Sequence, residues 1–419
     1  MQVIEHFKEL SSIPRCSYHG EAMRDYLCKK AEGYGYDVTV DGAGNVLCHR
    51  AEAKLTLQSH YDMVCIGRAP ELEICEDGGW LRARESTLGA DNGIGMAMML
   101  ELMAEGEAVD CLFTADEEVG LLGARALDVP LKAIPMLNLD SEEEGTVTIG
   151  CAGGVDIQVI KPVTTERKEG HCYRVEIGGL PGGHSGVEIH KNIPNAIQEL
   201  CKLIDDGVAL VEIGGGERRN SIPKNAYAII MSPIAIEARE HFEYLGQQEV
   251  AVIREGDDIV KMLVHFAHGV RAYDETLEIV HSSINLALVT TDETGVHVQL
   301  SARAMEEGAL RALEAQTLDY FESKGCRVQS EGFYPPWPPE RDRFAETVLE
   351  ASRPFFEDAA FSAIHAGLEC GVIKERYPKV EMASIGPNIT APHSTSEAVE
   401  IASVERVFAS VRAIVASLS

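Results

Sequence analysis

The sequence predicts an α/β protein: a catalytic domain with a central, mostly parallel sheet, interrupted by an inserted α+β lid domain. The two ends of the chain alternate short apolar strands with helices, which is typical of a parallel sheet covered on both faces. The middle of the chain instead joins neighbouring strands by a tight turn, as antiparallel sheets do. With 419 residues, the chain is long enough for two or three domains.

The first part of the catalytic domain is expected at residues 1–154. Apolar residues recur with helical spacing near 3–11, 20–34 and 92–105. Short apolar runs predict strands, and these are 36–40, 45–50, 55–60, 109–115 and 133–140. Ligands of such sheets bind just beyond the carboxyl ends of the strands. Polar residues that follow these strands are therefore the first candidates for a site.

The lid is expected at residues 155–335. Its predicted strands are 173–180, 208–214, 225–232, 284–291 and 296–304, and its predicted helices are 193–206, 256–268 and 306–323. Thr291-Asp-Glu-Thr-Gly295 forms the tight turn between the last two strands. The segment PPWPPE at 335–340 reads as a stiff linker. The catalytic domain resumes at 336–419, with elements near 343–355, 366–375, 381–385 and 396–417.

Composition excludes several kinds of partner. A net charge of -30 repels phosphate backbones and anionic membrane surfaces, so we expect neither nucleic acid nor membrane as a partner. No apolar run reaches the ~18 residues of a membrane span, and the N-terminus lacks a signal peptide's apolar core. We therefore expect a cytoplasmic protein. Eleven cysteines without a C-x-x-C pair argue against a disulfide framework and a Cys-rich zinc site.

Metal-capable residues gather at strand ends or in the loops that follow. The segments are LTLQSHYDM with His60 and Asp62, STLGADNG with Asp91, FTADEE with Glu117 and Glu118, LNLDSEEEG with Asp140, and ITAPHSTSE with His393. Each segment alone has an ordinary explanation, such as a solvated strand end or a helix N-cap. Together they indicate a metal centre.

The acidic triplet Asp116, Glu117 and Glu118 needs a cation, a shared proton or full solvation. At an effective dielectric of about 20, two unit charges ~4 Å apart repel by about 4 kcal/mol. Neighbours on a strand point to opposite faces, so the two glutamates need different roles. One can ligate a metal while the other acts as general base on a water. Asp116 is assigned no chemistry.

Two histidines and three carboxylates, one of them bridging, give each of two metal ions one imidazole and two carboxylates. This ligand set suits zinc, and manganese or cobalt can also occupy it. Two such ions activate a water and polarise a substrate carbonyl. The predicted reaction class is hydrolysis.

The order H-x-D, D, E-E, D, H closely resembles that of the co-catalytic di-zinc metallopeptidases. Within that family, TLGADNGIGMA, FTADEEVGLLGA, GGHSGVEIH and AIHAGLECG resemble motifs of the aminoacyl-histidine dipeptidases, which cleave Xaa-His dipeptides. The resemblance implies that His60, Asp91 and Asp140 hold one metal, and that Asp91, Glu118 and His393 hold the other. It also implies that Glu117 is the general base, that Asp62 orients His60, and that the Asp91–Asn92 peptide bond is cis.

The resemblance extends to substrate contacts. It implies that His184 in GGHSG helps to stabilise the tetrahedral intermediate, although a simple glycine turn is the alternative. Asn220 and Arg303 resemble positions that bind the substrate's terminal carboxylate, a task suited to an arginine fork. Glu369 is expected to receive the substrate's free amine, with a buried structural acid as the alternative, and His365 could be a core residue. A homodimer formed through the insert is a further expectation from the family.

Three functional hypotheses follow. The first is a metal-dependent dipeptidase acting on small peptides with a free amino terminus, including Xaa-His dipeptides. The second is an N-acyl amino acid amidohydrolase or a tripeptidase of the same fold. The third is a non-catalytic metal or peptide binder, against which Glu117 argues because binding alone needs no general base.

Overall fold

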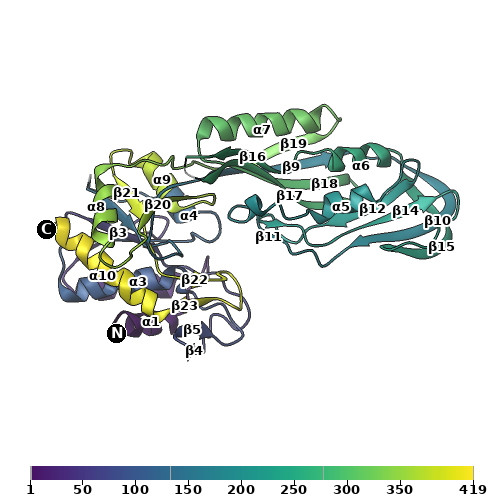
Figure 1. Cartoon of the computed structure of the whole chain (residues 1–419). Helices are drawn as coiled ribbons and strands as arrows, with labels where there is room; N and C mark the ends of the chain where they lie inside the picture. The colour runs from purple at the N-terminus through teal and green to yellow at the C-terminus, as the bar shows by residue number, and fades with distance from the viewer. Residues whose placement is uncertain (1, 133, 277, 419) are drawn as a thin grey trace. The chain divides into compact units, whose positions relative to one another are not determined.

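The computed structural model describes residues 2–132, 134–276 and 278–418. The chain divides into two compact units (Figure 1). The first unit comprises Met1–Cys151, Trp337–Ala363 and Leu368–Ser419. The second comprises Ala152–Pro336 and the short segment Ile364–Gly367. The predicted lid, residues 155–335, did not include this short segment.

The first unit is built on an eight-stranded sheet with a parallel centre. Its order is β1(Asp37–Val40)-β2(Val46–His49)-β6(Asp110–Thr114)-β3(Thr56–His60)-β7(Met136–Asn138)-β21(Met382–Ser384)-β8(Thr146–Cys151)-β20(Ala360–Ile364). The pairs from β6 to β21 are parallel, whereas the pairs β1–β2, β2–β6 and β21–β8 are antiparallel. The central, mostly parallel sheet predicted from the sequence is confirmed. Ala133, the first residue of one predicted strand, lies outside the described residues.

Helices cover this sheet with apolar faces. They are α1(Gln2–Ser11), α2(Glu21–Gly33), α3(Ala90–Glu105), α4(Leu122–Arg125), α8(Arg343–Ser352), α9(Glu369–Arg376) and α10(Ile401–Leu418). In α10, Val404, Val407, Val411 and Ile414 recur with helical spacing and join the core. The helix α3 is buried on nearly all sides, which explains its apolar run GIGMAMML. No helix in the described part of the chain is long and apolar enough to cross a membrane.

A second, four-stranded sheet in the first unit was missed by the sequence analysis. Its order is β22(Ile389–Thr390)-β23(Ala398–Glu400)-β5(Trp80–Ala83)-β4(Ile74–Asp77). The loop between β22 and β23 carries His393. This sheet therefore anchors the loop that carries an expected metal ligand.

The second unit contains a nine-stranded antiparallel sheet. Its order is β15(Phe242–Ile253)-β10(Thr165–Ile177)-β14(Ala226–Ser232)-β12(Ala209–Gly215)-β17(Ile279–Asp292)-β18(Gly295–Ala304)-β9(Gly153–Lys161)-β19(Arg327–Tyr334), with β16(Gly269–Asp274) beside β17. The helices α5(Ala196–Lys202), α6(Gly256–Val264) and α7(Glu307–Glu322) pack on it and share its apolar core. Smaller pieces are β11(Gly183–His184), β13(Ser221–Ile222) and the 3-10 helix η1(Ile189–Lys191).

Two local predictions have different outcomes. The tight turn at Thr291–Gly295 is confirmed, because β17 and β18 form a hairpin there. The segment 335–340 is more than a linker, since Trp337 is only 2% exposed. Its backbone exchanges hydrogen bonds of 2.8 and 3.0 Å with Cys151. The segment stays extended at Trp337, which forms an antiparallel bridge with Cys151, and burial of the bulky apolar side chain fixes it to the first unit.

Candidate metal centre

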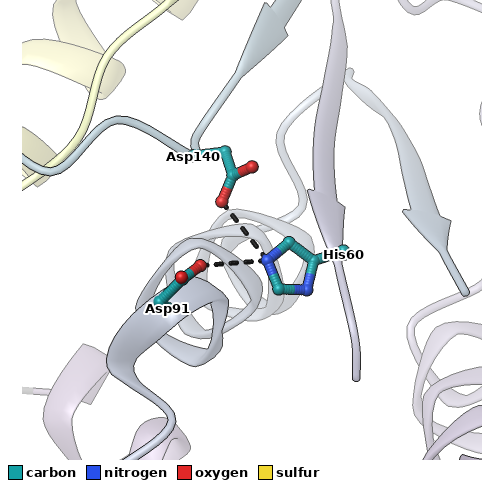
Figure 2. Close-up of side chains that lie close together, drawn as sticks. All are labelled: His60, Asp91 and Asp140. Atoms are coloured by element: carbon teal, nitrogen blue, oxygen red, sulfur yellow. Dashed lines mark hydrogen bonds and ion pairs between the residues drawn. The ribbon is translucent and has the colours of Figure 1, made fainter. Parts of the chain in front are cut away.

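The first group of expected ligands meets at the end of β3. His60 is the last residue of that strand and is 1% exposed. Its Nε2 atom lies 3.0 Å from Oδ1 of Asp91 and 3.4 Å from Oδ1 of Asp140 (Figure 2). Asp140 follows β7, which pairs in parallel with β3. The carboxyl ends of these strands share one edge of the sheet, which brings the two side chains together.

Asp91 connects this group with a second one. It lies at the start of α3, and its peptide bond to Asn92 is cis, as the resemblance implies. One carboxylate oxygen faces His60, and the other lies 3.1 Å from Nε2 of His393. The side-chain amide of Asn92 donates a hydrogen bond to Asp140. Asp91 therefore has the bridging position between two histidines.

The second group contains Asp91, Glu118 and His393. Nε2 of His393 lies 2.8 Å from Oε2 of Glu118. The other oxygen of Glu118 is buried and has no hydrogen-bond partner among the described residues. Within each of the two groups, one ligand atom per residue lies within 4.8 Å of the others. Two imidazoles, three carboxylates and an unpartnered buried oxygen fit a pair of divalent ions.

Charges within the cluster shift the pKa values of its members. Burial alone lowers the pKa of His393, but hydrogen bonds to Asp91 and Glu118 raise that pKa to about 11. Burial also opposes protonation of His60, yet Asp140 and the neighbouring aspartates raise its pKa well above the ordinary value. Burial raises the pKa of Glu118 to about 7, and the charge of Asp91 acts in the same direction. Without metal ions, protons on the histidines thus offset the carboxylate charge.

Asp62 supports the centre from behind His60. It is fully buried, and its Oδ1 lies 3.4 Å from Nδ1 of His60. The same oxygen accepts the backbone N–H of Glu117 at 2.9 Å, and Oδ2 accepts the hydroxyl of Ser17 at 2.7 Å. The N–H of Glu118 also reaches Oδ2, at 3.3 Å. One carboxylate therefore contacts an expected ligand and binds the backbone of both glutamates.

Glu117 lies beside the ligand atoms. It forms a further close group with His60 and Glu118, whose ligand atoms also lie within 4.8 Å of one another. Burial raises its pKa well above the ordinary value; the charge of His60 opposes this shift, and Glu118 adds to it. Asp116, by contrast, accepts the backbone N–H of Tyr18 at 2.6 Å. The three consecutive acids thus have three different environments.

Glu369 lies at the start of α9 in the first unit and is completely buried. Its Oε2 accepts hydrogen bonds of 2.6 Å from Gln58 and Thr114, while Oε1 has no partner among the described residues. Burial raises its pKa to about 7, and the charge of His60 opposes the shift. An acid with one fixed and one unsatisfied oxygen fits a ligand-binding role, but it also fits a structural one.

The remaining expected site residues belong to the second unit. Nδ1 of His184 accepts the backbone N–H groups of Gly186 and Val187, each at 3.2 Å. Arg303 is 8% exposed and donates from Nη1 to the hydroxyl of Tyr334 at 2.9 Å. The side chain of Asn220 is in an exposed position.

His365 is buried within the second unit. Its Nε2 lies 2.7 Å from the hydroxyl of Ser283. Burial lowers its pKa to about 3, and the charge of Arg303 adds to this shift. This burial agrees with the core position suggested for His365 from the sequence.

Several residues that contact the loops of the centre were not predicted from the sequence. Arg15 donates to the backbone carbonyls of Tyr61 and Asp62, and Ser17 binds the side chain of Asp62. Glu397 binds the backbone of the Asp91 loop. The segments IPRCS and HSTSE contain these residues, but no spacing in the sequence indicates their partners.

A disulfide joins Cys16 and Cys65 next to these contacts. The sequence argued against a disulfide framework, and the structure nevertheless contains this disulfide. Their separation of 49 residues gives no local pattern from which the pair could be read. Most of the other described cysteines are buried.

The chain is similar to several known proteins. Residues 56–417 match the sequence profile of peptidase family M20/M25/M40. A cytosol non-specific dipeptidase of Escherichia coli (strain K12) is 31% identical over 454 aligned positions, which cover 95% of this chain and 93% of the relative. The crystal structure of aminoacylhistidine dipeptidase from Vibrio alginolyticus superposes with a TM-score of 0.81 at 30% identity, covering 99% and 96% of the two chains. A tripeptidase from Staphylococcus aureus shares the fold, with a TM-score of 0.63 at 17% identity over 100% and 98%.

Proposed function

Because the chain belongs to peptidase family M20/M25/M40, we propose that it is a two-metal dipeptidase that hydrolyses dipeptides with a free amino terminus, Xaa-His dipeptides among them. The observation that carries the proposal is the position of Asp91 between two histidine-carboxylate groups, with Glu117 beside both. The Escherichia coli relative and the Vibrio alginolyticus protein, which are 31% and 30% identical to this chain, are both named as dipeptidases.

The ligand assignment follows the two groups of side chains. His60 and Asp140 would hold one ion, His393 and Glu118 the other, and Asp91 both. Zinc suits these nitrogen and oxygen donors best, and manganese or cobalt are the alternatives. When bound, the two ions supply Lewis acidity that lowers the pKa of a water and polarises the peptide carbonyl.

Glu117 acts as the general base in this proposal. Its carboxylate takes a proton from the attacking water and then gives it to the leaving amine. Its raised pKa suits the first transfer, because a carboxylate with an ordinary pKa is a weak base and takes a proton reluctantly near neutral pH. Asp62 keeps Glu117 in place through the backbone N–H and keeps His60 turned toward the ligands.

Substrate contacts complete the proposal. Glu369 receives the amine through its unsatisfied oxygen, and Asn220 and Arg303 bind the terminal carboxylate. His184 stabilises the tetrahedral intermediate. These roles come from the resemblance of the motifs, as does the expected homodimer, which light scattering of the purified protein tests. The name of the Escherichia coli relative supports a cytoplasmic location.

A product-resolved assay tests the function. The zinc-loaded protein is incubated with Xaa-His dipeptides, other dipeptides, tripeptides and N-acyl amino acids, each with a chelator control. Chelator-sensitive cleavage of dipeptides is expected, and the relative rates rank histidine at the second position. Cleavage of acyl amino acids or tripeptides alone contradicts the proposal, as does absence of turnover with two metal ions bound.

A further inference from the structure

Glu397 is a buried acid that binds backbone rather than a positively charged side chain. It is 2% exposed, and its Oε2 accepts the N–H groups of Leu88 and Gly89 at 2.7 and 2.9 Å. Its Oε1 accepts the N–H groups of Ala90 and Asp91 at 2.8 and 3.4 Å. Four consecutive donors thus converge on one carboxylate, a strong arrangement because the acceptor is charged.

The loop that carries Glu397 also carries His393. The N–H of Glu397 donates to the carbonyl of Ser394 at 3.1 Å, and the hydroxyl of Ser394 donates to the carbonyl of Ala391 at 2.8 Å. The loop is therefore folded on itself between β22 and β23. Since Glu397 holds the backbone up to Asp91, it ties the loop of one metal ligand to the loop of another.

Arg15 donates a hydrogen bond to a carbonyl group of the same stretch of backbone. This arginine is 1% exposed and donates from Nη2 to the carbonyl of Gly89 and from Nη1 to the carbonyl of Asp62 at 3.0 Å. Gly89 has a φ of 69°, and a Cβ there would lie 2.5 Å from Nη2 of Arg15. Only glycine therefore allows the loop to approach the arginine so closely.

We propose that Glu397 is a positioning residue of the metal centre: it fixes the backbone of Leu88–Asp91 and ties it to the His393 loop, so that Asp91 can serve two ions at once. A bridging carboxylate must satisfy the geometry of both ions, so its backbone tolerates little displacement. The inference rests on the proposed two-metal site but not on the identity of the substrate.

Zinc titration of the chelator-stripped full chain tests this role. The variants are Glu397→Gln, which removes the charge and turns an amide N–H₂ toward backbone donors, and Glu397→Asp, which keeps the charge but is shorter. Glu405→Gln is the matched control, because Glu405 is an exposed acid. We expect wild type and control to bind two zinc ions with equal affinities. We expect at least one site to bind about 10–100-fold more weakly in Glu397→Gln, and by a smaller factor in Glu397→Asp.

A second readout separates positioning from a merely structural role. A structural role lowers the unfolding temperature of the metal-free variants and leaves the zinc affinities of the folded protein unchanged. Wild-type zinc affinities in folded Glu397→Gln therefore overturn the inference. If that variant does not fold, wild-type affinities in Glu397→Asp overturn it instead. Two zinc ions in a wild-type protein that cleaves no dipeptide refute the proposed function and leave this inference standing.

Discussion

Replacement of Asp62 by asparagine isolates the contribution of a single buried carboxylate to the centre. Oδ1 of Asp62 accepts a hydrogen bond from the N–H of Glu117 and faces His60. Oδ2 accepts hydrogen bonds from the hydroxyl of Ser17 and the N–H of Glu118. Asparagine has the same shape, but one oxygen becomes an N–H₂ donor. The hydroxyl of Ser17 can reverse its hydrogen bond, so we expect the new donor to face Ser17. The N–H of Glu118 then loses its acceptor, and His60 loses its charged partner.

The magnitude follows from these contacts. Mutation of the carboxylate that supports a metal-bound histidine typically costs 10–100-fold in metal affinity or activity, which corresponds to about 1.4–2.7 kcal/mol. We expect Asp62→Asn to lower kcat/KM on a dipeptide, or the affinity of one zinc site, within that range. Steady-state kinetics at several zinc concentrations separate the two effects, because weakened metal binding is reversed by added zinc.

Asp116→Asn is the control for this experiment. Asp116 lies in the same acidic triplet and binds the N–H of Tyr18, but it belongs to neither group of expected ligands. Asparagine keeps an oxygen that can accept the N–H of Tyr18 and tolerates the positive φ of 49° at this position, so the replacement should leave kcat/KM within about twofold. Full activity and full zinc affinity in Asp62→Asn would refute the reasoning, and so would an equal loss in both variants.

Three further predictions concern the base, the pH dependence and the disulfide. Glu117→Gln should keep two metal ions, measured by metal analysis, while kcat falls by about 10²–10⁴-fold; near-normal turnover would remove Glu117 from the base role. The pKa of His393 is raised from 6.5 to about 11, so its stabilising contribution is complete below pH 6.5 and is lost as pH rises toward 11. The unfolding temperature of the chelated protein should therefore fall over this window, and less so in His393→Gln; equal slopes would contradict the assignment. Removal of the disulfide by Cys16→Ser should lower the free energy of unfolding in urea by about 2–4 kcal/mol, because the cross-link closes a long loop, and a dithiol reductant should then have no further effect.

The sequence was informative where local pattern and topology coincide. Apolar runs located the central strands, and the rule for the carboxyl ends of parallel strands explains why His60 and Asp140 lie together. The cis peptide bond at Asp91 and the turn at Thr291–Gly295 also agree with the expectations from motif and turn residues.

The sequence did not predict contacts between residues that are far apart in the chain and share no recognisable pattern. Glu397 binds backbone groups more than 300 positions earlier, and backbone donors leave no trace in the choice of residue. The pairing of Cys16 with Cys65 depends on how two loops meet, not on their spacing. The prolines around Trp337 indicate an extended segment, which is a local property. The burial of Trp337 depends on tertiary packing, which the local sequence does not indicate.

The order of strands in the first unit has a consequence for how the protein is made. The strand β21 lies between β7 and β8, although it is synthesised more than 230 residues after β8. While the ribosome is still translating residue 380, the strand that lies between β7 and β8 has not been synthesised. His393 and Glu397 have not been synthesised either. The second unit is nearly continuous in the chain and can fold during this time. A peptidase built in this order has no complete hydrolytic centre until its own synthesis is almost finished.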